Sequence, residues 1–99
     1  SDAGTTEFNE EFMAFITRYA WGDVWTRPGL EKKTRSLLNL AMLAALNRES
    51  EFKLHVKGAL NNGATSEDIK EVLFQVSIYA GVPAALSAFQ WARDVMDGL

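Results

Sequence analysis

The segment from Leu37 to Leu46 constrains the fold more than any other part of this sequence, because Asn39 is its only polar residue. A charged stretch that begins with Glu31 precedes this segment, and an acidic residue favours the positive end of a helix. A helix that is apolar on nearly all sides must be covered on most of them. We therefore predict a helix from about Glu31 to Leu46 that lies at the centre of the domain or in a subunit interface.

An amphipathic helix is predicted near the start of the chain. Apolar residues from Phe8 to Tyr19 recur at steps of three and four, which lines one face of a helix. The segment Trp21–Leu30 is predicted to be a loop, because Arg27 precedes Pro28 and a residue before proline is pushed out of the helical conformation.

Three more helices are predicted from proline, glycine and capping residues. They are Glu49–Asn62, a helix that begins after Thr65, and Ala84–Met96. Gly63 is expected to end the first of them, Thr65 and Asp68 match a capping box, and the Gly-Val-Pro run at 81–83 is expected to break the chain before the last. The sequence shows no strand-like alternation, so it predicts an all-α fold, a compact bundle of about five helices in a single domain over residues 1–99.

The composition excludes several classes of protein. There are no cysteines, so disulfides, thiolate nucleophiles and zinc–cysteine sites are excluded, and the single histidine cannot build a multi-histidine metal site. The net charge of −3, without a basic stripe, argues against a nucleic-acid partner. No apolar run is long enough to span a bilayer and the start lacks the layout of a secretion signal, which predicts a cytoplasmic protein without a membrane partner.

Arg48, Glu51 and His55 form the sharpest group of candidate catalytic residues. They lie at steps of three and four on the predicted Glu49–Asn62 helix, so their side chains project from one face. Glu51 can accept a hydrogen bond from the His55 ring and favour its protonated form, and the Arg48 guanidinium suits a carboxylate. The same spacing is also typical of an exposed ion pair beside an incidental histidine.

Two further groups are candidates for binding an anionic ligand. Arg35 leads from a basic stretch into the apolar helix, where it either extends its charged end to solvent or binds an anion. Trp21 and Trp25 share the predicted loop with Arg27. They either fix this loop to the core or form the wall of a dry pocket, with Arg27 as a hydrogen-bond donor.

Several motifs, in order along nearly the whole chain from about Phe8, resemble the carboxymuconolactone decarboxylase family. They are Arg18 to Leu30 (RYAWGDVWTRPGL), Thr34 to Leu43 (TRSLLNLAML), Asn47-Arg48-Glu49, Leu54-His55-Val56, Asn61 to Thr65 (NNGAT), Glu71 to Gln75 (EVLFQ) and Tyr79 to Ala85 (YAGVPAA). Ser36 and Tyr79 lie in these motifs and complete the candidate substrate-binding residues. Spacing alone places Tyr79 in the core more readily than in a site.

The resemblance implies an all-helical subunit in ring-like homo-oligomers, either a hexamer (a trimer of dimers) or a trimer. It implies decarboxylation of gamma-carboxymuconolactone to beta-ketoadipate enol-lactone in protocatechuate degradation, with no cofactor. Members usually carry an additional N-terminal helical segment, and this sequence begins after it. Related alkylhydroperoxidase D-like proteins use a Cys-x-x-Cys pair and a histidine. Aligning that histidine with His55 places Arg48 and Glu51 at the cysteine positions, so peroxidase chemistry is not expected.

For this reaction the candidate residues receive hypothetical roles. Arg35 or Arg27 would anchor the carboxymethyl arm of the lactone, and Arg48 or another donor would stabilise the developing oxyanion. His55, kept protonated by Glu51, would deliver the proton.

The leaving carboxylate would face an apolar wall formed by Trp21 or Trp25, where loss of hydration raises its ground-state energy. Two alternatives remain at this point. One is a related lactone decarboxylase or isomerase of the same family. The other is a non-enzymatic oligomeric binding protein in which the charged face holds subunits together.

Overall fold

The computed structural model describes residues 4–99, and every regular element in this range is helical. This confirms the predicted all-α fold. The first three residues, which contributed to the prediction that no secretion signal is present, lie outside the described part. The chain divides into two compact units, Ser1–Leu30 and Glu31–Leu99. Each unit is described by itself below.

The first unit consists of helix α1 (Glu10–Ile16), which continues directly into a π-helical segment, η1 (Thr17–Val24). The wider π-type turn is visible in the hydrogen bond from the Trp25 backbone N–H to the Ala20 carbonyl, at 2.9 Å. The prediction of a loop from Trp21 onward was therefore wrong at its start. Pro28 restricts only the residue before it, and one glycine does not end a helix.

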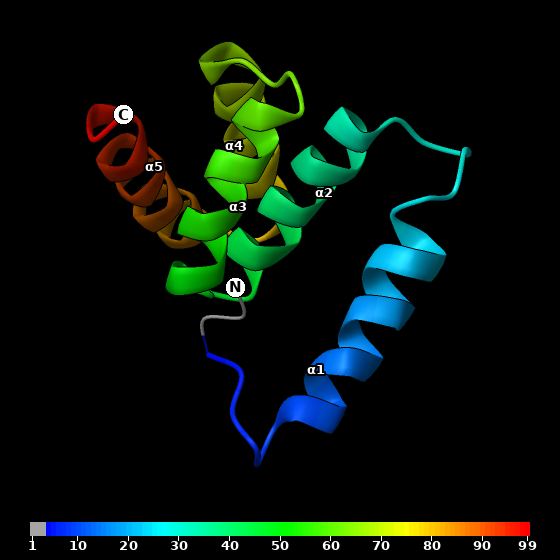
Figure 1. The fold of residues 1–99 in the computed structure, drawn as a ribbon. Helices are drawn as coiled ribbons and strands as arrows, with labels where there is room; N and C mark the ends of the chain where they lie inside the picture. The colour runs from blue at the N-terminus through cyan, green and yellow to red at the C-terminus, as the bar shows by residue number, and fades with distance from the viewer. Residues whose placement is uncertain (1–3) are drawn as a thin grey trace. The chain divides into compact units, whose positions relative to one another are not determined.

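The second unit contains the other four helices, α2 (Lys32–Ala45), α3 (Glu49–Asn61), α4 (Ser66–Tyr79) and α5 (Val82–Asp97). Helix α2 packs against all three of the others, α3 also packs against α5, and α4 against α5 (Figure 1). The apolar segment around Asn39 therefore lies in the helix that the other three share, as predicted for a central helix.

Short turns with specific backbone conformations connect these helices. Asn47 after α2 and Gly63 after α3 both have positive φ angles, 60° and 98°, which lets the chain leave each helix sharply. The predicted capping box at α4 is confirmed, because the Asp68 N–H donates to Thr65 Oγ1 at 3.1 Å and the Thr65 N–H to Asp68 Oδ2 at 2.9 Å.

Helix α5 begins two residues earlier than predicted, at Val82. Pro83 was expected to separate the last two helices, but it lies inside the first turn of α5. Proline is accepted there because the first N–H groups of a helix have no intrahelical partner, so its missing N–H costs nothing. The break is made by Gly81 instead, which has a φ angle of 106°.

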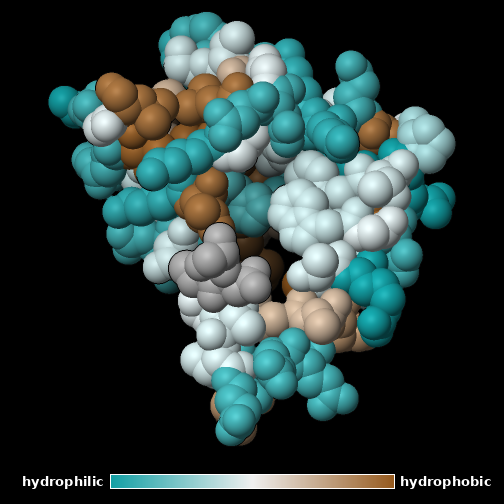
Figure 2. Space-filling view, viewed as in Figure 1, coloured by the Kyte–Doolittle hydropathy of each residue, from teal (hydrophilic) through white to brown (hydrophobic). Residues whose placement is uncertain are grey.

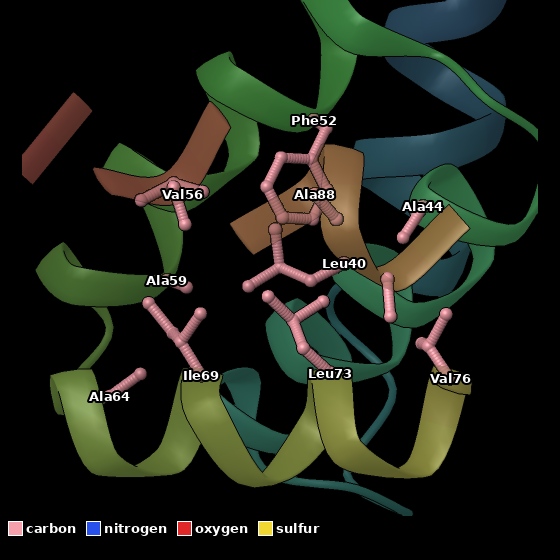
Figure 3. Packing of buried hydrophobic residues seen from close by; sticks show 12 residues of the cluster. Leu40, Ala44, Phe52, Val56, Ala59, Ala64, Ile69, Leu73, Val76 and Ala88 are labelled. Carbon is pink, nitrogen blue, oxygen red and sulfur yellow. The ribbon is translucent and has the colours of Figure 1, made fainter. Parts of the chain in front are cut away.

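The core of the second unit is a single cluster to which all four helices contribute. Figure 3 shows Ile69, Leu73 and Val76 along α4 pointing toward Leu40 of α2 and Phe52 of α3. From α5 mainly alanines enter this cluster, and such small side chains let helices approach closely. Phe52 is the largest fully buried side chain.

Part of the apolar surface of the second unit is not covered by the chain itself. Along α2, Leu38, Met42 and Leu46 are 48%, 54% and 70% exposed. Other exposed apolar side chains, on α4 and α5, are Phe74, Ile78, Val82, Leu86 and Phe89. Figure 2 shows that hydrophobic side chains reach the surface of the molecule. Within residues 4–99, no helix combines the length and apolar character that crossing a membrane requires.

We predict that Phe52→Ala destabilises the protein by about 3–5 kcal/mol, because it removes a fully buried ring and leaves a cavity in the core. Chemical denaturation at fixed protein concentration measures this change. The control is Lys57→Ala, an exposed position on the same helix, for which the change should stay within about 0.5 kcal/mol. Equal effects of the two substitutions would contradict the packing described above.

Candidate functional site

Arg48, Glu51 and His55 lie on one face at the start of α3. Arg48 immediately precedes the helix, Glu51 is in its first turn, and His55 follows one turn later. The Arg48 guanidinium donates to both oxygens of the Glu51 carboxylate, from Nη2 at 2.9 Å and from Nε at 3.5 Å. Their side chains are 59% and 46% exposed. The structure therefore brings the three predicted residues together, with Glu51 paired to Arg48.

Two opposing effects act on the pKa of His55. Half-burial of the His55 ring lowers its pKa, and the nearby Glu51 charge opposes this effect without cancelling it. The Arg48 hydrogen bond in turn lowers the pKa of Glu51 and keeps that carboxylate ionised. No hydrogen bond joins Glu51 to His55 in the described part of the chain. In the chain without a ligand, burial therefore opposes the expected protonation of His55, and the charge of Glu51 favours it.

Arg35 and Ser36 lie next to each other in the second turn of α2 but have different environments. The Arg35 side chain is partly buried. Ser36 is 2% exposed, and its Oγ accepts a hydrogen bond from Asn62 Nδ2 at 2.9 Å. This contact ties α2 to the C-terminal end of α3 from inside the unit. We therefore keep Arg35 as a binding candidate and leave Ser36 out of the proposed site.

Tyr79 was expected in the core from its spacing, but it is 82% exposed at the end of α4. It lines a largely apolar hollow of about 450 Å³ between α2 and α4. The hollow's other lining residues are Ala41, Met42, Ala45, Gln75, Val76 and Ala80. Sequence reasoning missed this hollow, although the small residues Ala41 and Ala45 in an apolar helix were a signal of open space.

Trp21, Trp25 and Arg27 belong to the first unit. The two indole rings stack on each other, with centroids 4.9 Å apart and planes 23° apart. Residues four apart on a helix lie on one face, which explains this pairing in a segment that had been predicted as a loop. The use of these residues as the wall of a site with the α3 residues stays a prediction.

Comparison with known proteins decides the family. Residues 10–94 match the carboxymuconolactone decarboxylase family. The chain belongs to this family. It is 46% identical over 93 residues to a protein named 4-carboxymuconolactone decarboxylase from Acinetobacter baylyi, and the match covers 94% of this chain and 69% of the relative. It is also 41% identical over 83 residues to a protein named nitrosuccinic acid decarboxylase from Metarhizium robertsii, and this match covers 84% of this chain and 58% of the relative.

We predict that His55 titrates below its ordinary pKa of 6.5 in the folded protein without a ligand. It is the only histidine, so its ring protons give one titration curve by NMR. The unfolded chain then takes up this proton at a higher pH than the folded one, so folding stability falls as the pH drops through about 6.5. The control is the same titration in denaturant, which should return the ordinary value. A higher midpoint in the folded protein would contradict the prediction.

Proposed function

We propose that this chain is a cofactor-independent carboxy-lyase that converts gamma-carboxymuconolactone to beta-ketoadipate enol-lactone in protocatechuate degradation. The observation that carries the proposal is the 46% identity, over 94% of the chain, to a protein named for this activity. The cluster of Arg48, Glu51 and His55 supports it, because it offers a cation, a carboxylate and a proton carrier on one helix face.

The reaction needs no cofactor because the substrate accepts its own electron pair. Its quaternary ring carbon carries both the carboxylate to be lost and a carboxymethyl arm. When carbon dioxide leaves, the electron pair moves through the ring double bond to the lactone carbonyl oxygen and forms a dienolate. A proton added to the carbon next to this carbonyl gives the enol-lactone. The protein must therefore bind the arm, stabilise the oxyanion and supply one proton.

The residues fit these tasks as follows. Arg35 or Arg27 binds the carboxymethyl arm with a charge-assisted hydrogen bond. Arg48, at the exposed start of α3, pairs with an anionic group of the substrate. His55 delivers the proton and recovers it from water.

Three aromatic residues are proposed to contact the substrate. Trp21 and Trp25 offer stacked aromatic surface for the leaving carboxylate. Tyr79, which lines the hollow between α2 and α4, remains a substrate-binding candidate.

We further propose that the protein works as a homo-oligomer, as a hexamer (a trimer of dimers) or a trimer. The exposed stripe of Leu38, Met42 and Leu46 on α2 supports this proposal, because apolar surface of this kind is favourably covered by another subunit. The apolar side chains exposed on α4 and α5 add to the same argument.

A second candidate is the decarboxylation of a different activated acid. The relative at 41% identity is named for nitrosuccinic acid, a diacid whose nitro group can also accept an electron pair. Both names describe an acid that keeps one carboxylate and carries its own electron acceptor. Comparing carbon dioxide release from the lactone and from nitrosuccinate distinguishes the two candidates.

We predict that the protein releases carbon dioxide from gamma-carboxymuconolactone and that His55→Gln lowers kcat about 100-fold or more, because the proton donor is lost. Carbon dioxide release and circular dichroism measured together separate catalysis from folding. The matched control is Lys57→Gln, an exposed residue two positions further along α3, which should keep the parent rate. Parental turnover by a folded His55→Gln variant would remove His55 as the proton donor.

A further inference from the structure

Glu51 lies between two basic partners on one face of α3. Arg48 precedes it by three residues and His55 follows it by four, and both steps bring helix side chains together. Without a ligand, the Arg48 guanidinium holds both oxygens of the Glu51 carboxylate, at 2.9 and 3.5 Å. The carboxylate is therefore turned toward Arg48. Its other partner on the helix, His55, receives only the longer-range effect of its charge.

A ligand carboxylate can compete for the same guanidinium. The Arg48 side chain is 59% exposed, so an acid in solution can reach it. A guanidinium binds any carboxylate through the same two-point geometry, and an exposed ion pair contributes little stability that would resist exchange. A carboxylate of an acidic ligand can thus take the place of the Glu51 carboxylate at Arg48, with the same geometry.

We propose that a ligand carboxylate displaces Glu51 from Arg48, and that the released Glu51 carboxylate turns along α3 to accept a hydrogen bond from the His55 ring. This inference rests on the proposed function, since it describes how the same site takes up its acid and prepares its proton donor. We call this rearrangement the Glu51 exchange. It breaks no covalent bond, and His55 takes the proton it gains from water.

The surroundings of His55 make Glu51 the group that controls its charge. The charged residues on the helices packed against α3 are Lys32, Lys33 and Arg35 on α2 and Arg93, Asp94 and Asp97 on α5. Three ion pairs engage several of them: Lys33 with Asp68, Asp94 with Lys53, and Arg93 with Asp97. The charge that raises the pKa of His55 against its burial is that of Glu51.

The exchange makes the proton donor depend on the substrate. Burial lowers the pKa of His55 and so favours the neutral ring while the site is empty. When Glu51 turns to His55, a direct charge-assisted hydrogen bond favours the protonated ring. The charged form of His55 is then favoured only when an anionic ligand occupies the site. An anionic ligand is also what triggers the change, which selects for substrates that retain a carboxylate.

The test is the NMR titration of His55 in the full chain, with and without a probe that cannot lose carbon dioxide. A suitable probe is the saturated form of the lactone, which keeps both carboxylates on the quaternary carbon but lacks the ring double bond that accepts the electron pair. We expect saturating probe to raise the titration midpoint of His55 by about one pH unit. In Glu51→Gln the rise should fall to less than half, because only the probe's own charge then acts on the ring.

Arg48→Met provides a second arm that needs no ligand. It frees Glu51 permanently, so the midpoint of His55 should already be raised in the free protein. The matched control is Arg93→Met, which removes an arginine from another exposed ion pair and should leave the midpoint unchanged. An unchanged midpoint in a folded Arg48→Met variant would overturn the exchange, whatever the activity of the protein.

The remaining outcomes separate the exchange from the proposed function. Probe binding with an unchanged midpoint, or an equal rise in Glu51→Gln, overturns the exchange and leaves decarboxylation standing. A ligand-induced rise that needs Glu51, in a protein that releases no carbon dioxide from either acid, supports the exchange and overturns the proposed function. A probe that does not bind at any concentration overturns both.

Discussion

The setting of α3 against the core is the constraint on which the candidate site depends. Phe52, Val56 and Ala59 are fully buried and fix which side of α3 faces the other helices. Glu51 and His55 each come one residue before a member of this set, so they flank the buried face. This position leaves the His55 ring half-buried and gives the Glu51 carboxylate access to solvent. The electrostatics of the site therefore follow from the packing of one helix.

The resulting arrangement has one carboxylate and two basic neighbours. A carboxylate at the start of a helix is already favourable, because the helix dipole is positive there. For the same reason Arg48 is poorly placed for helix stability, and Glu51 compensates its charge at 2.9 Å. An anionic substrate that pairs with Arg48 provides the same compensation. Binding and proton supply are then linked through a single side chain, without a metal or an organic cofactor in the proposed chemistry.

Much of the fold could be predicted because its signals are local. The apolar run around Asn39 predicted the shared helix, and Thr65 with Asp68 predicted a cap that the structure forms. The errors also have local causes. Pro83 was taken as a helix breaker although the first turn of a helix accepts proline, and a single glycine did not end the helix near Trp21.

The site was less predictable, since it depends on burial and on side-chain conformation. Spacing placed Arg48, Glu51 and His55 on one face, as the structure does. It could not tell which neighbour Glu51 would choose, because steps of three and four are equally favourable. Tyr79 was assigned to the core by the same periodicity, which does not reveal which apolar face the chain leaves uncovered.

The most direct test of the link between substrate binding and the proton on His55 compares the pH dependence of kcat with that of kcat/KM for carbon dioxide release. The first reports the proton donor in the substrate complex and the second reports it in the free protein. We predict that kcat falls with rising pH at a midpoint above that of kcat/KM, and that Glu51→Gln brings the two midpoints together. Coincident midpoints in the parent protein, or a kcat that does not change with pH, would contradict the role given to Glu51 and His55.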